Sequence, residues 1–207
     1  MKIFTHNFNP NSNSGPNKFT RDLFKGLQDF NNVSIAQDQI SADIEFCLIQ
    51  QLLEKKKPMA LRLDGIYFNT SQDFKSLNAP IRRTYEASDA VIFQSNFNKS
   101  LTEHWFGEHK NSFVVHNATS VGKIQNSLFL PGVPEDAEVW CCASNWRPHK
   151  RLVENVRYFL EFSPEDSFLA VAGSGVDKPT LEKISDLIRT YRNHRKNILI
   201  LGDLSYE

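Results

Sequence analysis

The feature that most constrains the fold is the alternation of short apolar runs with longer amphipathic stretches along the chain. An apolar run of about four to eight residues suits a strand that is buried on both faces, whereas apolar residues spaced three and four positions apart suit a helix. Parallel sheets produce this alternation, because each strand reaches its parallel neighbour through a crossover that is usually helical. The sequence therefore predicts an α/β protein with parallel sheets covered on both faces.

The apolar runs give eight predicted strands, and the amphipathic stretches give four predicted helices. The strands are Lys2–His6, Asp43–Ile49, Met59–Leu63, Ala90–Gln94, Ser112–His116, Val139–Ser144, Ser167–Ala172 and Asn197–Leu201. The helices are Lys18–Phe30, Asn96–Phe106, Lys150–Phe162 and Lys178–Tyr191. Ser95 has a side chain suited to an N-cap and marks the start of the second helix.

A segment rich in glycine and proline interrupts the alternation and predicts two domains. The segment covers residues 118–137 and contains Gly122, Pro131, Gly132 and Pro134, so it is interpreted as a linker. Residues 1–117 then form an N-terminal Rossmann-like domain, and residues 138–207 form a C-terminal one. A doubly wound nucleotide-binding sheet has about six strands. Because only three strands follow the linker, the second domain is predicted to be incomplete: either the sequence is a fragment or the fold is unusually small.

Composition excludes several classes of partner. Lys and Arg total 24 and Asp and Glu also total 24, so the net charge is zero and does not indicate nucleic acid. Three cysteines without a CxxC spacing indicate neither a disulfide framework nor a zinc site, and a cytoplasmic protein is predicted. No stretch approaches the roughly 20 apolar residues of a membrane span. Contact with the inner face of a membrane is therefore expected to be peripheral at most, and the oligomeric state is left open.

Candidate binding residues follow the strands, because ligands of open α/β sheets lie beyond the carboxyl ends of the strands. Gly15 and Asn17 lie in the turn after the first strand, which leads into a helix; a plain surface loop is the alternative. Asp64 follows the third strand and either projects into a cleft or caps a turn. Gly173, Ser174 and Gly175 follow the seventh strand, but a GxG turn without the full GxGxxG pattern is weak evidence for a nucleotide site.

The strongest local signal is the basic turn "SNWRPHKR" over residues 144–151. Arginine and lysine make charge-assisted hydrogen bonds to phosphate oxygens, so such a turn suits a diphosphate. Basic residues at a helix N-terminus oppose the helix dipole, which disfavours a purely structural explanation. The sequence contains no GxSxG elbow, no Cys–His pairing and no Asp-x-Asp, so neither a hydrolase nucleophile nor a metal-bridged diphosphate site is predicted.

Taken in order, these segments resemble glycosyltransferase family 4 and its relatives, which have the two-domain GT-B architecture. The resemblance is carried by "SDAVIFQSNFNKSLTEHWF", "NSFVVHNATS", "VWCCASNWRPHKRLVENVRYFLEF", "FLAVAGSGVD" and "NILILGDLSYE", and it covers nearly the whole chain. It implies two Rossmann-like doubly wound sheets, of which the second is incomplete. The family's later Glu-containing motif, which contacts the donor sugar and ribose, has no counterpart before Glu207.

The resemblance also implies roles for individual residues. Lys150 would hold the donor diphosphate, and Arg147 would replace an arginine that the family has a few positions earlier, where this chain has Ser144 and Asn145. These four residues, together with Gly15, Asn117, Gly173, Ser174 and Gly175, would form the donor site. Asn17 and Asp64 would hold the acceptor, and Asp64 would also act in catalysis beside Lys150 and Arg147.

The implied activity is transfer of a sugar, hexosyltransferase-like, from a nucleotide-diphosphate sugar to a hydroxyl acceptor. The reaction would retain the anomeric configuration, need neither metal nor cofactor, and serve glycan, polysaccharide or glycolipid synthesis. Two alternatives stay open at this point. One is a nucleotide-sugar epimerase of the same form, with His116 beside Asn117 as its acid/base pair. The other is a noncatalytic nucleotide-sugar-binding domain.

Overall fold

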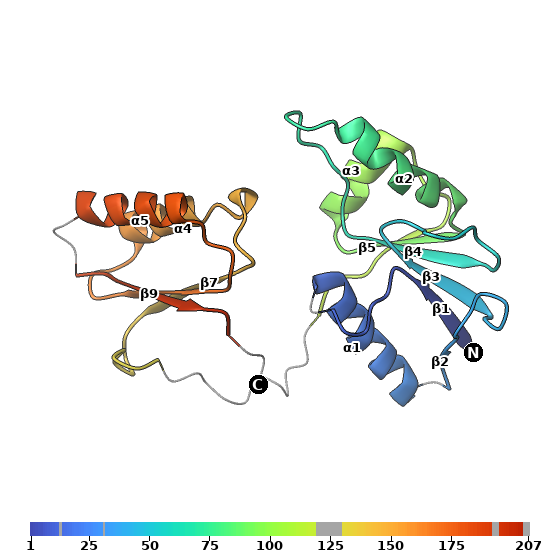
Figure 1. Cartoon of the computed structure of the whole chain (residues 1–207), viewed down its shortest axis with the longest axis horizontal. Coiled ribbons are helices and arrows are strands. Elements are labelled where there is room, and N and C mark those ends of the chain that lie inside the picture. The colour runs from blue at the N-terminus through green and yellow to red at the C-terminus, as the bar shows by residue number, and fades with distance from the viewer. Residues whose placement is uncertain (13, 31, 119–129, 192–194, 205–207) are drawn as a thin grey trace. The chain divides into compact units, whose positions relative to one another are not determined.

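A computed structural model describes the chain except residues 13, 31, 119–129, 192–194 and 205–207. The chain divides into two compact units, Met1–Gly122 and Lys123–Glu207 (Figure 1). Most of the linker predicted over residues 118–137 lies outside the described residues, and its described part, from residue 130 to 137, contains turns but no helix or strand. No helix among the described residues is both long and apolar enough to cross a membrane.

The first unit is a six-stranded parallel sheet with helices on both faces (Figure 1). The strand order is β2-β1-β3-β4-β5-β6. The strands are β1 (Lys2–His6), β2 (Ser34–Ile35), β3 (Ile44–Leu48), β4 (Met59–Leu63), β5 (Ala90–Phe93) and β6 (Ser112–Val114). The helices are α1 (Gly15–Phe30), α2 (Phe74–Ala87) and α3 (Asn96–Phe106).

Successive residues of each strand point to opposite faces of this sheet, and two apolar cores result. Ile3 and Phe46 pack with Phe24 of α1 on one face. Leu61 and Phe93 belong to the other core, which α2 and α3 cover. Because both faces are covered, these strands are largely apolar, which is why the sequence predicts them well.

The second unit has a three-stranded parallel sheet with order β7-β8-β9. Its elements are β7 (Val139–Ala143), the 3-10 helix η2 (Pro148–Lys150), α4 (Leu152–Phe162), β8 (Phe168–Ala172), α5 (Lys178–Thr190) and β9 (Asn197–Gly202). Both helices pack on one face of the sheet, around Val156, Phe159 and Ile184 (Figure 1). In the described part of this incomplete sheet, helices therefore cover one face. Two right-handed crossovers that advance in the same direction place both helices on the same side.

The predicted strands agree with the observed ones to within two residues at each end, and the Ser95 cap accepts a hydrogen bond from the Asn98 N–H at 3.1 Å. Helix α2 and the short strand β2 were not predicted. Helix α2 carries Pro80 in its interior and buries the polar residues Asn78 and Thr84 toward the sheet, so the apolar period that would have indicated a helix is weak.

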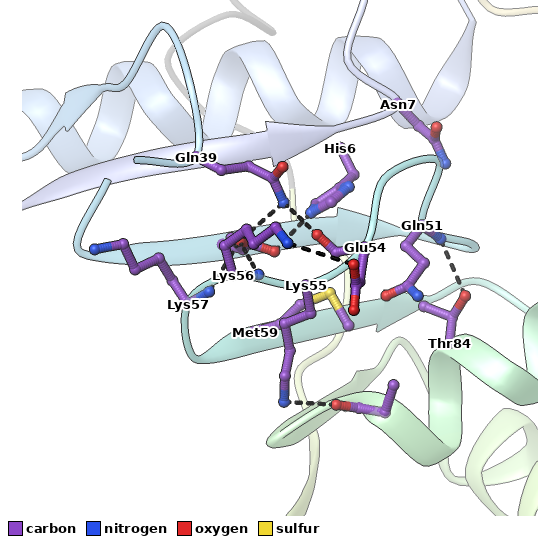
Figure 2. A network of polar contacts seen from close by, with 12 residues as sticks. His6, Asn7, Gln39, Gln51, Glu54, Lys55, Lys56, Lys57, Met59 and Thr84 are labelled. Carbon is purple, nitrogen blue, oxygen red and sulfur yellow. Dashed lines mark hydrogen bonds and ion pairs between the residues drawn. The ribbon is translucent and has the colours of Figure 1, made fainter. Parts of the chain in front are cut away.

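The connection from β3 to β4 contains no helix, and a buried carboxylate holds it against the sheet. Glu45 of β3 is fully buried and its Oε2 lies 2.8 Å from His6 Nε2. Glu45 Oε1 accepts hydrogen bonds from the backbone N–H groups of Lys56 and Lys57, at 2.8 and 3.0 Å, and from the Gln39 side chain at 3.0 Å. Figure 2 shows His6, Gln39 and Lys56 converging from three segments of the chain.

Candidate functional site

Four polar side chains form a closed hydrogen-bonded cluster at the carboxyl ends of β4, β5 and β6. The Arg62 guanidinium forms an ion pair with Asp64 and donates to Asn117 Oδ1 at 2.7 Å. Asn117 Nδ2 donates to Gln94 Oε1 at 3.0 Å, and Gln94 Nε2 donates to the Asp64 carbonyl at 2.6 Å. We call these four residues the Arg62 cluster. It joins Asp64 and Asn117, two residues that the sequence analysis selected separately.

Burial determines the electrostatics of the Arg62 cluster. The Arg62 side chain is 4% exposed, and its guanidinium carbon lies 3.6 Å from the centroid of the Phe19 ring, a cation–π contact. Burial raises the pKa of Asp64, and the positive charge of Arg62 opposes this shift. Burial also lowers the pKa of Arg62, against the attraction of Asp64. The Asp64 side chain keeps 27% of its surface exposed, so a fixed carboxylate faces solvent at the sheet edge.

A pocket of about 530 Å³ opens beside this cluster, between the start of α1, the ends of β1 and β3, and the first turns of α2. We call it the Tyr67 pocket. Its described lining consists of Asn7, Ser14, Pro16, Asn17, Leu48, Ile49, Gln50, Tyr67, Ser76, Leu77, Pro80 and Ile81. Asn17 therefore lies where a ligand could contact it, whereas Asp64 is not part of the lining.

A larger pocket, of about 760 Å³, lies elsewhere in the first unit and is lined in part by Phe4, Gln39, Leu53 and Lys56. Its lining comes largely from the segments that precede β3 and β4, which is the amino-terminal side of the sheet. Open parallel sheets bind ligands at the opposite, carboxyl edge. Position in the fold therefore favours the smaller Tyr67 pocket as the functional one.

The loop before α1 is held by the side chain of Asn17. Its Oδ1 accepts a hydrogen bond from the Asn9 N–H at 2.7 Å, and its Nδ2 donates to Ser14 Oγ at 2.8 Å. Gly15 is the first residue of α1, and a Cβ added there would have no atom within 4 Å. Contacts among the described residues therefore do not explain the glycine at this position.

In the second unit the turn after β8 packs directly against the loop after β7. Trp146 is buried; its backbone N–H donates to the Ser174 carbonyl at 2.7 Å, and its indole Nε1 donates to the Ala172 carbonyl at 3.0 Å. A Cβ on Gly173 would lie 1.8 Å from the Ser144 carbonyl oxygen, and one on Gly175 would lie 2.9 Å from the Asn145 side chain. Contacts within the protein therefore account for both glycines.

The basic turn after β7 is exposed and precedes the helix rather than opening it. The predicted start of a helix at Lys150 is wrong, because Lys150 ends η2 and α4 begins at Leu152. Arg151 separates them with a left-handed backbone, φ 54°. Within the described part of the chain, the charged groups of Arg147 and Lys150 have no hydrogen-bond or ion-pair partner, so both cations are available to an anion.

The structure brings together Asp64 with Asn117 in one unit, and Ser144 and Asn145 with the 173–175 turn in the other. The sequence analysis missed three residues of the first unit as candidates: Arg62, Gln94 and Tyr67. Arg62 carried a signal, since an arginine inside the apolar run "MALRL" must find a buried partner. The described residues contain no group of three or more His, Cys, Asp or Glu side chains that could hold a metal ion.

The fold is that of the GT-B class, α/β with two Rossmann-like parallel sheets, of which the second has three strands here. The solved proteins that share it include HepE and a sucrose-phosphate synthase. HepE of Anabaena, solved in complex with UDP-glucose, matches 100% of this chain over 70% of its own length, with 13% identity and a TM-score of 0.64. Sucrose-phosphate synthase from Thermosynechococcus elongatus matches 99% of this chain over 61% of its own length, with 11% identity and a TM-score of 0.56. No protein-family model and no curated protein matches the chain.

Proposed function

We propose that this chain is a glycosyltransferase that transfers a sugar from a nucleotide-diphosphate sugar to a hydroxyl acceptor. The observation that carries the proposal is the exposed pair of cations, Arg147 and Lys150, at the carboxyl end of β7 in a GT-B fold. Their charged groups have no partner among the described residues, and in HepE the same fold holds UDP-glucose. Charges without protein partners at this edge suit the oxygens of a diphosphate.

The chemistry follows from the charge that develops on the leaving group. The bond between the anomeric carbon and the diphosphate breaks, the acceptor oxygen bonds to that carbon, and the acceptor proton passes to an oxygen of the leaving diphosphate. Lys150 and Arg147 would stabilise the growing negative charge, which accelerates the reaction only because that charge is larger in the transition state. We further propose a retaining, metal-independent reaction with no cofactor, in glycan, polysaccharide or glycolipid synthesis.

The proposed residue roles divide between binding the donor and binding the acceptor. Ser144, Asn145 and the 173–175 turn would border the nucleotide, and the resemblance implies that Gly15 and Asn117 also bind the donor. Asn17 and Asp64 would hold the acceptor. Arg62 would act through Asp64 and Asn117, because it bonds to both of these side chains and is itself buried.

Calorimetric titration of the full chain with UDP, GDP and ADP tests the donor site. We expect one nucleotide to bind and Lys150→Ala to weaken it about tenfold or more, the effect of losing roughly 1.4 kcal/mol or more of charge-assisted hydrogen bonding. Lys183→Ala, which removes another exposed lysine of the second unit, is the matched control and should bind like the wild type.

Absence of binding by all three nucleotides, or equal binding by both variants, would refute the proposed donor site. Turnover separates the remaining alternatives, because an epimerase converts the nucleotide sugar without an acceptor. An epimerase would also need acid/base groups such as His116 beside Asn117. Nucleotide binding without any turnover would indicate a noncatalytic domain.

A further inference from the structure

The lining of the Tyr67 pocket indicates which chemical class of acceptor it takes. Each of the twelve described lining residues is uncharged. The polar ones offer amide and hydroxyl groups, from Asn17, Gln50, Ser14 and Ser76, and the remainder are largely apolar. An anionic acceptor such as a lipid phosphate needs arginine or lysine donors at its oxygens. A saccharide needs amide and hydroxyl partners for its hydroxyl groups and an apolar surface for its C–H groups.

Tyr67 supplies such a surface and is held in place by a buried asparagine. Asn78 of α2 is buried, and its side chain makes two hydrogen bonds to the backbone of Tyr67: Oδ1 accepts from the N–H at 2.8 Å, and Nδ2 donates to the carbonyl at 2.7 Å. The Tyr67 side chain itself is left 46% exposed on the pocket wall. The two hydrogen bonds anchor the backbone of Tyr67, and an accessible aromatic ring presents a negative face that attracts weakly positive C–H groups.

Two other residues that line the pocket, Ile49 and Asn7, have a strained backbone. Ile49, which directly follows β3, has φ 65°, a left-handed conformation that is rare for a β-branched residue. Asn7, which directly follows β1, also has a positive φ of 60°, and its Nδ2 donates to the carbonyls of Leu48 and Gln50 on either side of Ile49. Strain of this kind costs about 1 to 3 kcal/mol and persists where the surrounding structure fixes a functional geometry.

We propose that the Tyr67 pocket binds an uncharged saccharide, which stacks on Tyr67 and serves as the acceptor; the acceptor role rests on the proposed transferase function. The structure thus assigns Tyr67 as a specificity-determining residue and Asn78 as the residue that positions it. A volume of about 530 Å³ lies within the range of about 300 to 1,000 Å³ that is usual for small-molecule sites.

Saturation-transfer NMR of the full chain tests this inference with the methyl glycosides of glucose, galactose, mannose and N-acetylglucosamine as probes. We expect at least one glycoside to bind and Tyr67→Ala to raise its Kd about tenfold. Tyr67→Phe should bind like the wild type, because it keeps the stacking surface. Tyr158→Ala, which removes another exposed tyrosine in α4, is the matched control. Far-UV circular dichroism confirms that each variant is folded.

Farnesyl phosphate serves as the anionic probe in the same experiment. Binding of farnesyl phosphate but of no glycoside overturns the inference, and so does glycoside binding that Tyr67→Ala leaves unchanged. The nucleotide titration and the glycoside test can succeed or fail independently of each other. If nucleotide binds through Lys150 and no glycoside binds, the inference is wrong and the transferase proposal stands. If a glycoside binds at Tyr67 and no nucleotide binds, the saccharide site stands and the acceptor role falls with the transferase proposal.

Discussion

Gly173 has two separate physical reasons to be glycine, and neither requires a ligand. Its φ of 107° lies outside the range that other residues adopt readily, and a Cβ would lie 1.8 Å from the Ser144 carbonyl oxygen. The GxG pattern of this turn is weak evidence for a nucleotide site, and the turn is assigned to the donor site only through the resemblance to glycosyltransferase family 4. At the scale of a single residue, that pattern does not distinguish a glycine that admits a ligand from one that admits a neighbouring loop.

Replacing Gly173 with alanine tests whether the clash with the Ser144 carbonyl requires a glycine at this position. We expect Gly173→Ala to lower the free energy of unfolding by about 3 kcal/mol or more, because backbone strain and a clash with backbone atoms act together. Urea denaturation followed by tryptophan fluorescence measures the change, since Trp140 and Trp146 lie in the second unit.

Gly202 provides the control for strain alone. Its φ is 69°, but a Cβ there would meet no atom within 4 Å. Gly202→Ala should therefore cost only about 1 to 2 kcal/mol. Equal losses in the two variants would contradict the proposed clash between Gly173 and the loop after β7.

At the scale of elements, the β3–β4 connection shows how side chains can replace a crossover helix. Besides the bonds to Glu45, Gln51 donates its backbone N–H to Thr84 Oγ1 at 3.0 Å, and Lys55 Nζ donates to the Ala87 carbonyl at 2.8 Å (Figure 2). The connection is thus fastened to β3 through the backbone of Lys56 and Lys57, and to α2 through Gln51 and Lys55. Its backbone donors would otherwise lack partners beside an apolar sheet.

Loss of the Glu45 carboxylate should release this connection. We expect Glu45→Ala to lower the free energy of unfolding by about 3 to 5 kcal/mol, because it removes one partner of a buried pair and leaves several buried donors without acceptors. Glu54→Ala is the matched control in the same connection; its side chain is 86% exposed, so the expected change is within about 0.5 kcal/mol. Chemical denaturation of both variants at neutral pH measures the difference.

The same carboxylate gives stability a dependence on pH. Burial alone would raise the pKa of Glu45, but hydrogen bonds from His6, Lys56, Gln39 and Lys57 bring its pKa below the ordinary value. A carboxyl whose folded pKa is lowered contributes stability above its unfolded pKa, about 4.3, and that contribution is lost as the pH falls through the lower folded value. The stability difference between wild type and Glu45→Ala should therefore shrink below about pH 4. A difference that stays constant from pH 7 to about pH 3 would exclude this account.

At the scale of the whole molecule, each unit has cores of its own. The first unit packs its sheet on both faces, around Phe24 on one face and Leu61 on the other. The second unit packs one face of its sheet around Phe159. Because the cores are separate, each unit is predicted to unfold without the other.

A cavity in the core of the second unit tests that independence. Phe159 is fully buried and lies edge-to-face with Trp140 at 6.0 Å between ring centroids, so Phe159→Ala should cost about 3 to 5 kcal/mol. Hydrogen exchange should show lost amide protection in β7, β8 and β9 while β1 and β3 keep theirs. Phe162→Ala in the same helix removes a ring that is 62% exposed and should leave both units protected. Equal loss in both units would show that they unfold as one.

The sequence by itself determined the fold class and eight of the nine strands that the structure describes. Buried parallel strands are continuous apolar runs and their connections are amphipathic, so both are visible in local composition without knowledge of distant contacts. The basic turn around Lys150 was visible for the same reason, because its residues are consecutive. Helix α2 was not visible, since its buried face includes Asn78 and Thr84, whose partners lie in other segments.

Only the tertiary structure decided which residues share a site. Arg62 is hydrogen-bonded to Asn117, which lies 55 positions later in the sequence. Asn78 of α2 is hydrogen-bonded to the backbone of Tyr67, which lies 11 positions earlier. The tertiary structure also showed that Gly173 faces Ser144, a residue of the neighbouring strand's loop. Parallel strands bring the ends of distant segments to one edge, and a pattern within a single segment carries no information about which neighbour its side chains will meet there.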